Sequence, residues 1–482
     1  MDENHEICEI IPSQKEKNKI NVRGYLMTQE KKLKDTYYWC CEKKKLENCK
    51  GRAITNFYNG SHYLKKFVEH NHSPQPSNAK VAEIIGQIKQ KARVTRDKPS
   101  QIIQDITSSM LQDYQPYMPS SNALRAIIGR IKRAEMPAQP QTIEEIIVPD
   151  SLRLTLNGDT FLIKDSEIGN DRILLFATQA NIRRLSQASF WLMDGTFKTV
   201  PTVFRQLYTI HAPVGGENSR IFPLVYSLLT SKSEEIYSCL FEELIDFAVE
   251  NDITLQPSII LTDFELASIN ASRHVFPNVE NKGCFFHLCQ SGWRKIQSCG
   301  LATRYGDDEQ FSLILRHLFA LAFLSPQEIP EAFDILKLEM PPEANDVVQW
   351  FEDNYVHGRI RRHLRNENVI RSAPLFPPQL WSVYNLNEMG IPRTQNNVEA
   401  WHRRLEILVG QSHLGVYKII GELQKEQQRV DFQVERIIRG ELCPAKKKAL
   451  IEKEKRIATV LNDKENRSIM EFLRGIAHNL ML

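Results

Sequence analysis

The strongest hydrophobic pattern lies between residues 189 and 265. Three apolar runs there have the length and residue types of buried strands, at residues 189–194, 204–211 and 221–229. Apolar side chains at helical spacing then predict a helix over 234–250, and a fourth apolar run over 258–263 predicts another strand. Because a helical crossover makes the strand that follows it parallel, this last strand can lie beside the first. The pattern therefore predicts a mixed sheet in the middle of the chain.

Other patterns flank this sheet and divide the chain into parts. Residues 20–72 contain short strand-like pieces separated by polar turns, whereas residues 80–136 and the C-terminal region have helical spacing. We predict four parts, at residues 13–74, 80–136, 145–410 and 411–482. The third part begins with a hairpin over 152–163 and a helix at about 171–187, and a helical insertion at about 284–395 interrupts it.

Three strands, a helix and a returning strand are the order in which a ribonuclease H-like sheet begins. The expected fold class is therefore α/β (α+β). It comprises a ribonuclease H-like mixed sheet with a helical insertion, preceded by a small β-rich segment and a helical segment that could bind DNA.

Composition and sequence pattern argue against a membrane-spanning protein and against a secreted, disulfide-bonded one. The chain has 482 residues, of which 42% are hydrophobic and 25% charged, as in ordinary globular proteins. No apolar run reaches the roughly 18 residues that a membrane helix needs, and the first residues lack the pattern of a secretory signal. Nine cysteines, an odd number in a long chain, indicate thiols or metal ligands in a reducing compartment and not a disulfide framework.

The net charge of +3 is unevenly distributed along the chain. Residues 13–72 contain 14 Lys and Arg and 6 Asp and Glu, a local net charge of +8. Such a concentration is typical of a nucleic-acid footprint, although a solvated basic surface has the same composition. A second basic run, over residues 359–365, suits either a DNA backbone contact or a solvated helix face.

Three acidic residues carry the candidate chemistry. Asp194 and Asp263 each end a predicted strand, and Glu399 lies on a helix predicted to start at about Asn396. Ligands of open α/β sheets bind at the carboxyl ends of strands, and three carboxylates there can hold two divalent cations for phosphoryl transfer. Each acid also has a structural interpretation, as a turn residue, a helix cap and an exposed helix residue respectively.

A second constellation lies in the basic N-terminal segment. Cys41, Cys49, His70 and His72 offer two thiolates and two imidazoles, the ligands of a tetrahedral structural zinc. Cys40 competes with Cys41 as the first ligand, and we favour Cys41. The segment is too short to be stable on its core alone, so metal binding would add the missing stability.

The same segment resembles a FLYWCH zinc finger. The resemblance rests on three motifs, Tyr38-Trp-Cys-Cys41, Cys49-Lys-Gly-Arg52 and His70-Asn-His72. Cys40 stands where the family usually has a basic residue, and Gly51 occupies a variable position. The resemblance implies structural Zn²⁺ and binding to double-stranded DNA, with DNA-facing side chains at Lys43, Lys44, Lys45, Lys50 and Arg52.

The central region resembles the transposase domain of Mutator-like elements (MULE). The matching motifs are Asp194-Gly-Thr-Phe197, Leu261-Thr-Asp-Phe-Glu265, Cys284-Phe-Phe-His287, and Arg393-Thr-Gln-Asn-Asn-Val-Glu399 followed by His402. The resemblance implies that Asp194, Asp263 and Glu399 are catalytic and bind two Mg²⁺ or Mn²⁺ ions. Gln395 replaces the first Asn of the pair that usually precedes this Glu.

Four further residues belong to these motifs or follow them. Cys284, His287 and His402 would support the site, and for Cys284 and His287 packing competes with a zinc site completed by His274, Cys289 or Cys299. Trp293 is either a core residue or a stacking partner for a displaced base.

Together the resemblances imply a nuclear DNA transposase, or a protein derived from one. It would recognise transposon ends through the finger, cleave a DNA strand and transfer it to target DNA, acting as a homo-oligomer. The alternative is a domesticated, catalytically silent DNA-binding transcriptional regulator. The helices after residue 414 would either mediate oligomerisation or pack on the core.

Overall fold

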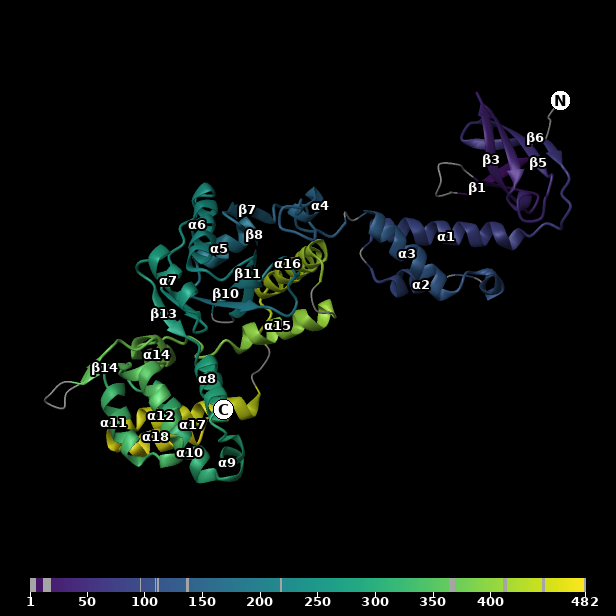
Figure 1. The fold of residues 1–482 in the computed structure, drawn as a ribbon. Coiled ribbons are helices and arrows are strands. Elements are labelled where there is room, and N and C mark those ends of the chain that lie inside the picture. Colours follow the sequence, from purple (N-terminus) through teal and green to yellow (C-terminus); the bar gives the residue numbers. More distant parts are fainter. Residues whose placement is uncertain are drawn as a thin grey trace. The chain divides into compact units, whose positions relative to one another are not determined.

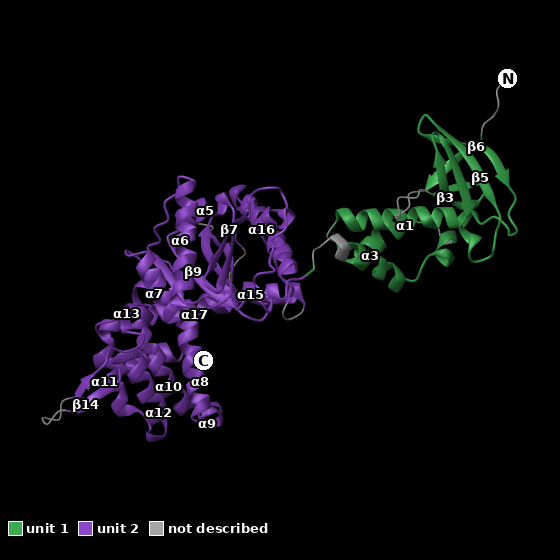
Figure 2. Cartoon of the chain, turned by 45° about the horizontal axis from the view of Figure 1, so that its top comes forward, with its two compact units in different colours: residues 1–138 green, residues 139–482 purple. Residues whose placement is uncertain are grey.

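The computed structural model describes residues 6–11, 19–95, 97–108, 110, 112–135, 138–216, 219–363, 369–410, 414–443 and 447–480. The chain separates into two compact units, Met1–Ala138 and Gln139–Leu482 (Figure 2). No helix in these described ranges is both long and apolar enough to cross a membrane.

The first unit begins with a closed six-stranded barrel. Its strands are β1 (Ile7–Ile11), β2 (Lys19–Val22), β3 (Tyr25–Leu33), β4 (Thr36–Cys41), β5 (Arg52–Tyr58) and β6 (Ser61–Val68). Each strand pairs antiparallel with the next, and β1 closes the barrel against β6. The predicted β-rich N-terminal segment is confirmed, and β1 extends it beyond the predicted start.

A buried hydrogen-bonded chain crosses the inside of the barrel. Nε1 of Trp39 donates to Oγ1 of Thr55 at 2.7 Å, and this hydroxyl lies 3.0 Å from Nδ1 of His62. All three side chains are almost fully buried. A buried polar group without a partner is costly, so this chain lets the large indole enter a small core without that cost.

Three helices follow the barrel in the same unit. They are α1 (Pro76–Val94), α2 (Pro99–Thr107) and α3 (Ser121–Glu135). Ile88, Ile102 and Ile128 are fully buried in a separate apolar cluster shared by the three helices. The helices predicted over 80–136 are therefore present.

The second unit is built around a seven-stranded sheet (Figure 1). Its strands are β7 (Leu162–Ile168), β8 (Asp171–Ala177), β9 (Phe190–Thr196), β10 (Gln206–Val214), β11 (Arg220–Leu229), β12 (Ile259–Thr262) and β13 (Glu280–Gly283). Their order across the sheet is β13-β12-β9-β10-β11-β8-β7. Strand β12 runs parallel to β9 and beside it, as predicted from the crossover helix α6 (Glu234–Glu250).

The start of this unit differs from the prediction. The expected hairpin over 152–163 is instead the helical turn α4 (Asp150–Arg153) and a loop with a single bridge between Leu154 and Thr160. The expected helix at 171–187 is strand β8 followed by helix α5 (Gln179–Ser186). Residues 173–177 form a continuous apolar run, and such a run fits a fully buried strand as well as a buried helix.

Consecutive residues of β9 point into two different cores. Phe190 and Leu192 join a large cluster formed with the helical insertion, whereas Trp191 and Met193 join the cluster formed with α5 and α6. A strand buried on both faces reads as continuously apolar, as β9 does. Both faces of the central strand are thus fixed by packing, which positions the residues at its end.

The insertion and the C-terminal region are mainly helical. Their helices are α8 (Phe285–Ser298), α9 (Ala302–Asp307), α10 (Glu309–Ala320), α11 (Ile329–Glu339), α12 (Asn345–Phe351), α13 (Pro378–Trp381), α14 (Tyr384–Glu388), α15 (Asn396–Val409), α16 (Val416–Ile438), α17 (Lys448–Asn462) and α18 (Ile469–Ala477). One two-stranded ribbon, β14 (Ile360–His363) with β15 (Val369–Arg371), lies among them.

The C-terminal helices pack on both cores of the second unit. Val430 and Val434 of α16 are buried in the cluster around the sheet. Ile457 of α17 and Phe472 of α18 are buried against the insertion. The predicted helical C-terminal region is confirmed, and of the two roles expected for it the structure shows packing on the core.

Candidate functional site

The structure brings the four predicted zinc ligands together at one end of the barrel. Cys41 ends β4, Cys49 lies in the loop before β5, and His70 and His72 follow β6. One ligand atom from each side chain lies within 4.8 Å of the others. Alternate residues of β4 face inward, so Cys41 is buried on the side of Trp39, whereas Cys40 faces the other way.

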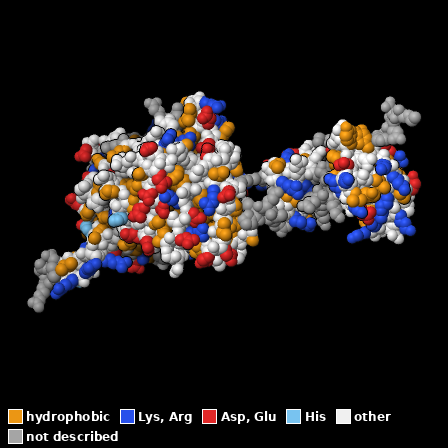
Figure 3. All heavy atoms as spheres, turned by 90° about the horizontal axis from the view of Figure 1, so that it is seen from above, with side chains coloured by type: hydrophobic (Ala, Val, Ile, Leu, Met, Phe, Trp, Pro, Cys, Tyr) orange, Lys and Arg blue, Asp and Glu red, His pale blue; other side chains and the backbone are white. Residues whose placement is uncertain are grey.

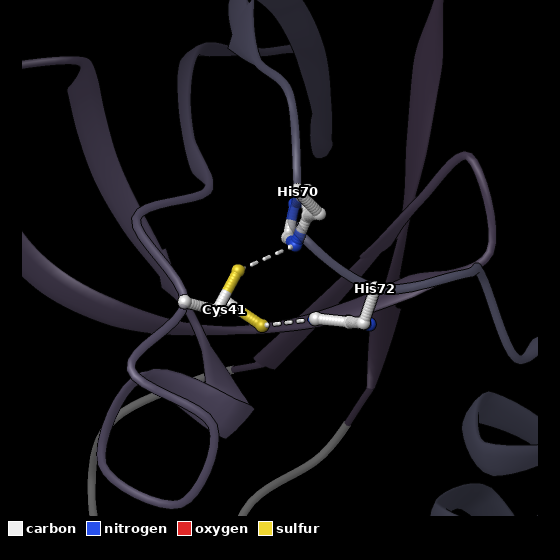
Figure 4. Close-up of side chains that lie close together, drawn as sticks. Cys41, His70 and His72 are labelled. Atoms are coloured by element: carbon white, nitrogen blue, oxygen red, sulfur yellow. Dashed lines mark hydrogen bonds between the residues drawn. The ribbon is translucent and has the colours of Figure 1, made fainter.

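The spacing between these atoms matches tetrahedral coordination. Sγ of Cys41 is 3.2 Å from Nε2 of His72, and Sγ of Cys49 is 3.4 Å from Nδ1 of His70 (Figure 4). With Zn–S bonds of about 2.3 Å and Zn–N bonds of about 2.0–2.1 Å, a tetrahedral ion separates its S and N ligands by roughly 3.5 Å. Two thiols and two imidazoles at this spacing form a donor set that fits zinc.

Surrounding groups hold these ligands in place. The backbone N–H groups of Lys43 and Gly51 donate to the sulfur atoms of Cys41 and Cys49, each at 3.4 Å. Nδ1 of His72 lies 3.1 Å from the carbonyl oxygen of Ser73, which leaves Nε2 as the ligand nitrogen. Such outer contacts set ligand orientation and support a structural zinc site.

Burial sets the protonation of the ligands. It raises the pKa of the Cys41 thiol to about 11, and the neighbouring Cys49 thiol adds to the effect. Burial also lowers the pKa of His70, with repulsion from His72 as a second cause, so His70 stays neutral and able to bind a metal. A divalent cation would displace the thiol protons, as in other Cys-containing zinc sites.

Gly51 is required by the close approach of a zinc ligand. A Cβ atom at this position would lie 2.4–2.6 Å from the ring of His70. We therefore expect Gly51→Ala to displace His70 and to weaken zinc binding by about 10–100-fold, the range seen when groups that orient a ligand are lost. Competition with a chromogenic chelator measures the zinc affinity. Gly129→Ala in α3 is the control, because a Cβ there has no neighbour within 4 Å and the backbone is helical, and equal affinity in the two variants would contradict the prediction.

The predicted DNA-facing residues of the finger lie near these ligands. Nζ of Lys43 is 2.8 Å from Glu47, and Nζ of Lys44 is 2.6 Å from Glu30. Arg52 also pairs with Glu30, at 3.2 Å. Lys45 is exposed on the loop between the two cysteines, and Lys50 is exposed directly after Cys49. DNA contact by these five residues stays a prediction.

Two of the three predicted catalytic acids lie side by side at the sheet. Strands β9 and β12 are paired in parallel, with Leu192 opposite Leu261, so Asp194 and Asp263 occupy matching positions two residues further on. The strand predicted to end at Asp194 continues to Thr196, so Asp194 lies within β9, two residues before its end, and Asp263 follows β12 directly. Burial, followed by repulsion from Asp194 and Glu265, raises the pKa of Asp263 to about 6.

Helix α15 brings the third acid and a histidine to the same region. Nε2 of His402 lies 3.3 Å from Oδ2 of Asp194, and both side chains are buried. Oε1 of Glu399 lies 3.2 Å from Nε2 of His287. Burial lowers the pKa of His287, but hydrogen bonds to Cys284 and Glu399 outweigh it and raise the pKa to about 11. A pKa raised in this way favours the protonated form of His287 beside Glu399.

The acids do not form a closed set of metal ligands as the finger residues do. Across the ranges that the structure describes, the finger set is the one group of His, Cys, Asp or Glu atoms with the spacing of a metal site. Glu399 is directed to His287, and its side chain is 41% exposed. The structure thus brings Asp194 and Asp263 together and holds Glu399 on the neighbouring helix through a histidine.

Comparison with models of protein families gives two matches in this chain. Residues 190–291 match the MULE transposase domain. Residues 10–72 match the FLYWCH zinc finger domain. Both resemblances inferred from the sequence are confirmed, and they support a transposase-related, DNA-binding function. Comparison with curated proteins found no match.

The two matches cover the candidate sites unequally. The FLYWCH match contains all four cysteine and histidine ligands. The MULE match contains Asp194, Asp263 and His287 but ends before Glu399 and His402. The match to the MULE transposase domain thus covers the part of the candidate site that lies on the sheet.

Gln395 connects the elements that carry the acids, and sequence reasoning missed this role. Its fully buried Nε2 donates to the carbonyl oxygens of Met193 at 3.1 Å and Leu261 at 2.6 Å. Its backbone N–H donates to Sγ of Cys284 at 3.4 Å. Gln395 caps α15, so one side chain joins β9, β12 and the helix of Glu399. The signal in the sequence was its departure from the Asn of the MULE motif.

The remaining residues of the MULE motif have structural surroundings. Cys284 precedes α8 and is fully buried against Gln395, and Cys289 is also buried. No metal-ligand group in the described ranges includes Cys284 or His287. The ring of Trp293 packs against Tyr305, with centroids 5.2 Å apart, beside the core of the insertion. Base stacking by Trp293 stays a prediction.

Proposed function

We propose that this protein is a DNA transposase that cleaves a DNA strand and joins it to target DNA. The observation that carries the proposal is the parallel pairing of β9 and β12 within the MULE match. This pairing sets two carboxylates beside each other, where burial first and then repulsion from Asp194 raise the pKa of Asp263. Carboxylate oxygens are the ligands that hard divalent cations prefer, and here two carboxylates lie near the carboxyl ends of adjacent strands.

The strand arrangement supports a ribonuclease H-like core. Three antiparallel strands, β9 to β11, are followed by a helix and then by two parallel strands, β12 and β13, on the other side of β9. We propose this fold for the sheet, with β7 and β8 as an added hairpin.

In the proposed mechanism Asp194, Asp263 and Glu399 hold two Mg²⁺ or Mn²⁺ ions. When bound, such ions lower the pKa of a water and stabilise the departing 3′ oxygen. Water then breaks one P–O bond of the DNA backbone and leaves a 3′-OH, which attacks a phosphodiester of the target and releases its 3′ oxygen. His402 would orient Asp194, and His287 would orient Glu399. We propose that the protein acts in the nucleus as a homo-oligomer.

The test of this proposal is cleavage by a charge-removing variant. We expect purified Asp194→Asn protein to lose Mg²⁺-dependent cleavage of DNA carrying the flanking element ends by about 1,000-fold or more. A lost metal ligand removes several kcal/mol of transition-state stabilisation, and each 1.36 kcal/mol is tenfold in rate. Binding of duplex DNA should be unchanged.

Asp346→Asn is the matched control, because Asp346 is an exposed acid on α12. It should cleave at the parental rate. Parental cleavage by Asp194→Asn would overturn the catalytic assignment.

One observation favours a second function, a catalytically silent DNA-binding regulator. Glu399 is held by His287 and does not complete a ligand group with the aspartates. If the parental protein binds element ends tightly but neither cleaves nor joins them in Mg²⁺ or Mn²⁺, the regulator is the correct function.

A further inference from the structure

The helical insertion carries a two-stranded ribbon that projects from it (Figure 1). Strand β14 contains most of the described part of the second basic run noted in the sequence. The residues form a strand and not the helix face considered there. Every described residue of β14 is exposed, so this element does not contribute to a core.

The root of the ribbon is fixed to the core of the insertion. Glu352 is buried, and its carboxylate accepts hydrogen bonds from Lys337 at 2.6 Å and Arg371 at 2.7 Å. Arg371 also donates to the carbonyl oxygen of Gly358 at 2.8 Å, and Ser372 N–H donates to the carbonyl of Arg359. An ion pair with a buried carboxylate is costly to break, so the two strands leave the core at a fixed place.

The ribbon beyond this root is strongly basic. Arg359, Arg361, Arg362 and His363 are exposed, and Figure 3 shows Lys and Arg side chains gathered along the projecting ribbon. None of the three arginines forms an ion pair with an acid in the described ranges, unlike Arg371. A bulge between Ile360 and Arg362 places two residues opposite one and breaks strict alternation, so Arg361 and Arg362 are not confined to opposite faces.

We propose that this ribbon is a second contact with duplex DNA, separate from the zinc finger, with Arg361 and Arg362 on backbone phosphates. The proposal rests on the proposed DNA function. The major groove of B-form DNA admits a two-stranded ribbon, whereas the deep, narrow major groove of double-stranded RNA does not. Arginine binds phosphate oxygens through two parallel N–H donors and gains counterion release.

The test measures the binding of full-length protein to duplex DNA as a function of salt. The variant is Arg361→Gln/Arg362→Gln, and the control is Lys425→Gln/Arg439→Gln, which removes the same charge from exposed ion pairs on α16. Each phosphate contact contributes about 0.9 to the slope of log K against log salt. For Arg361→Gln/Arg362→Gln, we expect the magnitude of this slope to fall by about two and the affinity for duplex DNA to fall by about tenfold near physiological salt.

Element ends and an unrelated duplex are compared in the same assay. An equal loss on both supports a phosphate contact, and Arg361→Lys/Arg362→Lys should restore the slope because it restores the charges. A loss of DNA affinity no larger than that of the control overturns the proposal. A loss that is larger on double-stranded RNA than on duplex DNA also overturns it. Thermal unfolding midpoints of both variants should equal that of the parent.

Binding is measured without cleavage, so the two proposals fail separately. If the parental protein does not cleave DNA but binds it through the ribbon, this inference stands and the catalytic proposal fails. If the parental protein cleaves DNA and the ribbon variant binds like the control, only this inference fails.

Discussion

Cys49→Ser protein will lose its bound zinc, and the barrel of the first unit will unfold. The barrel encloses a small core around Trp39, and domains of this size are marginally stable without a disulfide or a bound metal ion. Structural zinc contributes about 10–16 kcal/mol of apparent binding free energy in comparable small domains, more than a whole domain's usual stability. The expected results are a zinc-to-protein ratio near zero and fast amide hydrogen exchange in peptides from residues 19–72.

Cys40→Ser is the control for this experiment and also decides the competing ligand assignment. Cys40 is adjacent to Cys41 in β4 but lies outside the group of four ligands. Its replacement should leave zinc content and exchange in the barrel unchanged. Zinc loss in Cys40→Ser, with retention in Cys49→Ser, would exclude the ligand set described above. Peptides from the sheet of the second unit report whether either change acts beyond the finger.

The sequence predicted best the elements with strong periodicity. Helix α6 has the predicted limits, because its apolar side chains repeat at helical spacing and Ser233 caps its first turn. Strand β12 lies beside β9 as expected from chain crossover rules. Local pattern predicts an element where its apolar positions repeat at a clear spacing, and connectivity then places the strand that follows a crossover helix.

The errors occurred where the local pattern was ambiguous. The helix predicted at about 171–187 is a strand over 171–177, because the apolar run at 173–177 does not distinguish a helix from a buried strand. Asn157-Gly158 does form a turn, with Gly158 at φ +94°, but no hairpin follows because its flanks do not pair beyond one bridge. The basic run at 359–365 gave no strand signal, since pairing with β15 depends on the insertion that holds both strands.

The zinc ligands of the finger could be predicted from the sequence more completely than the arrangement of the three acids. Thiols and imidazoles have few other uses at such spacing, so the finger ligands could be named from sequence. The pairing of Asp194 with Asp263 followed from the strand order. The position of Glu399 beside His287 did not, because it depends on how α15 and α8 pack. The role of Gln395 depends on carbonyl groups 202 and 134 residues away in sequence, and backbone acceptors leave no trace in side-chain patterns.

Gln395→Leu will destabilise the second unit and, separately, slow DNA cleavage. Leucine has a similar size but cannot donate, so the buried carbonyl oxygens of Met193 and Leu261 lose their shared partner. Two unsatisfied acceptors cost about 2–4 kcal/mol in total. The same change releases α15 from β9 and β12, and a displacement of about 1 Å at Glu399 would reduce cleavage by about 100-fold.

Gln424→Leu separates these two effects because it removes an equivalent pair of hydrogen bonds elsewhere. Gln424 is also fully buried, and its Nε2 donates to the carbonyl oxygens of Ser151 and Leu154, which belong to no proposed site. Both variants should lower the unfolding midpoint, Gln424→Leu by less, because Ser151 and Leu154 are exposed and their carbonyl oxygens can bind water. Only Gln395→Leu should cleave slowly at a temperature where both are folded. Equal cleavage rates would show that Gln395 stabilises the fold without positioning the acids, and the link between α15 and the two aspartates would then have no catalytic consequence.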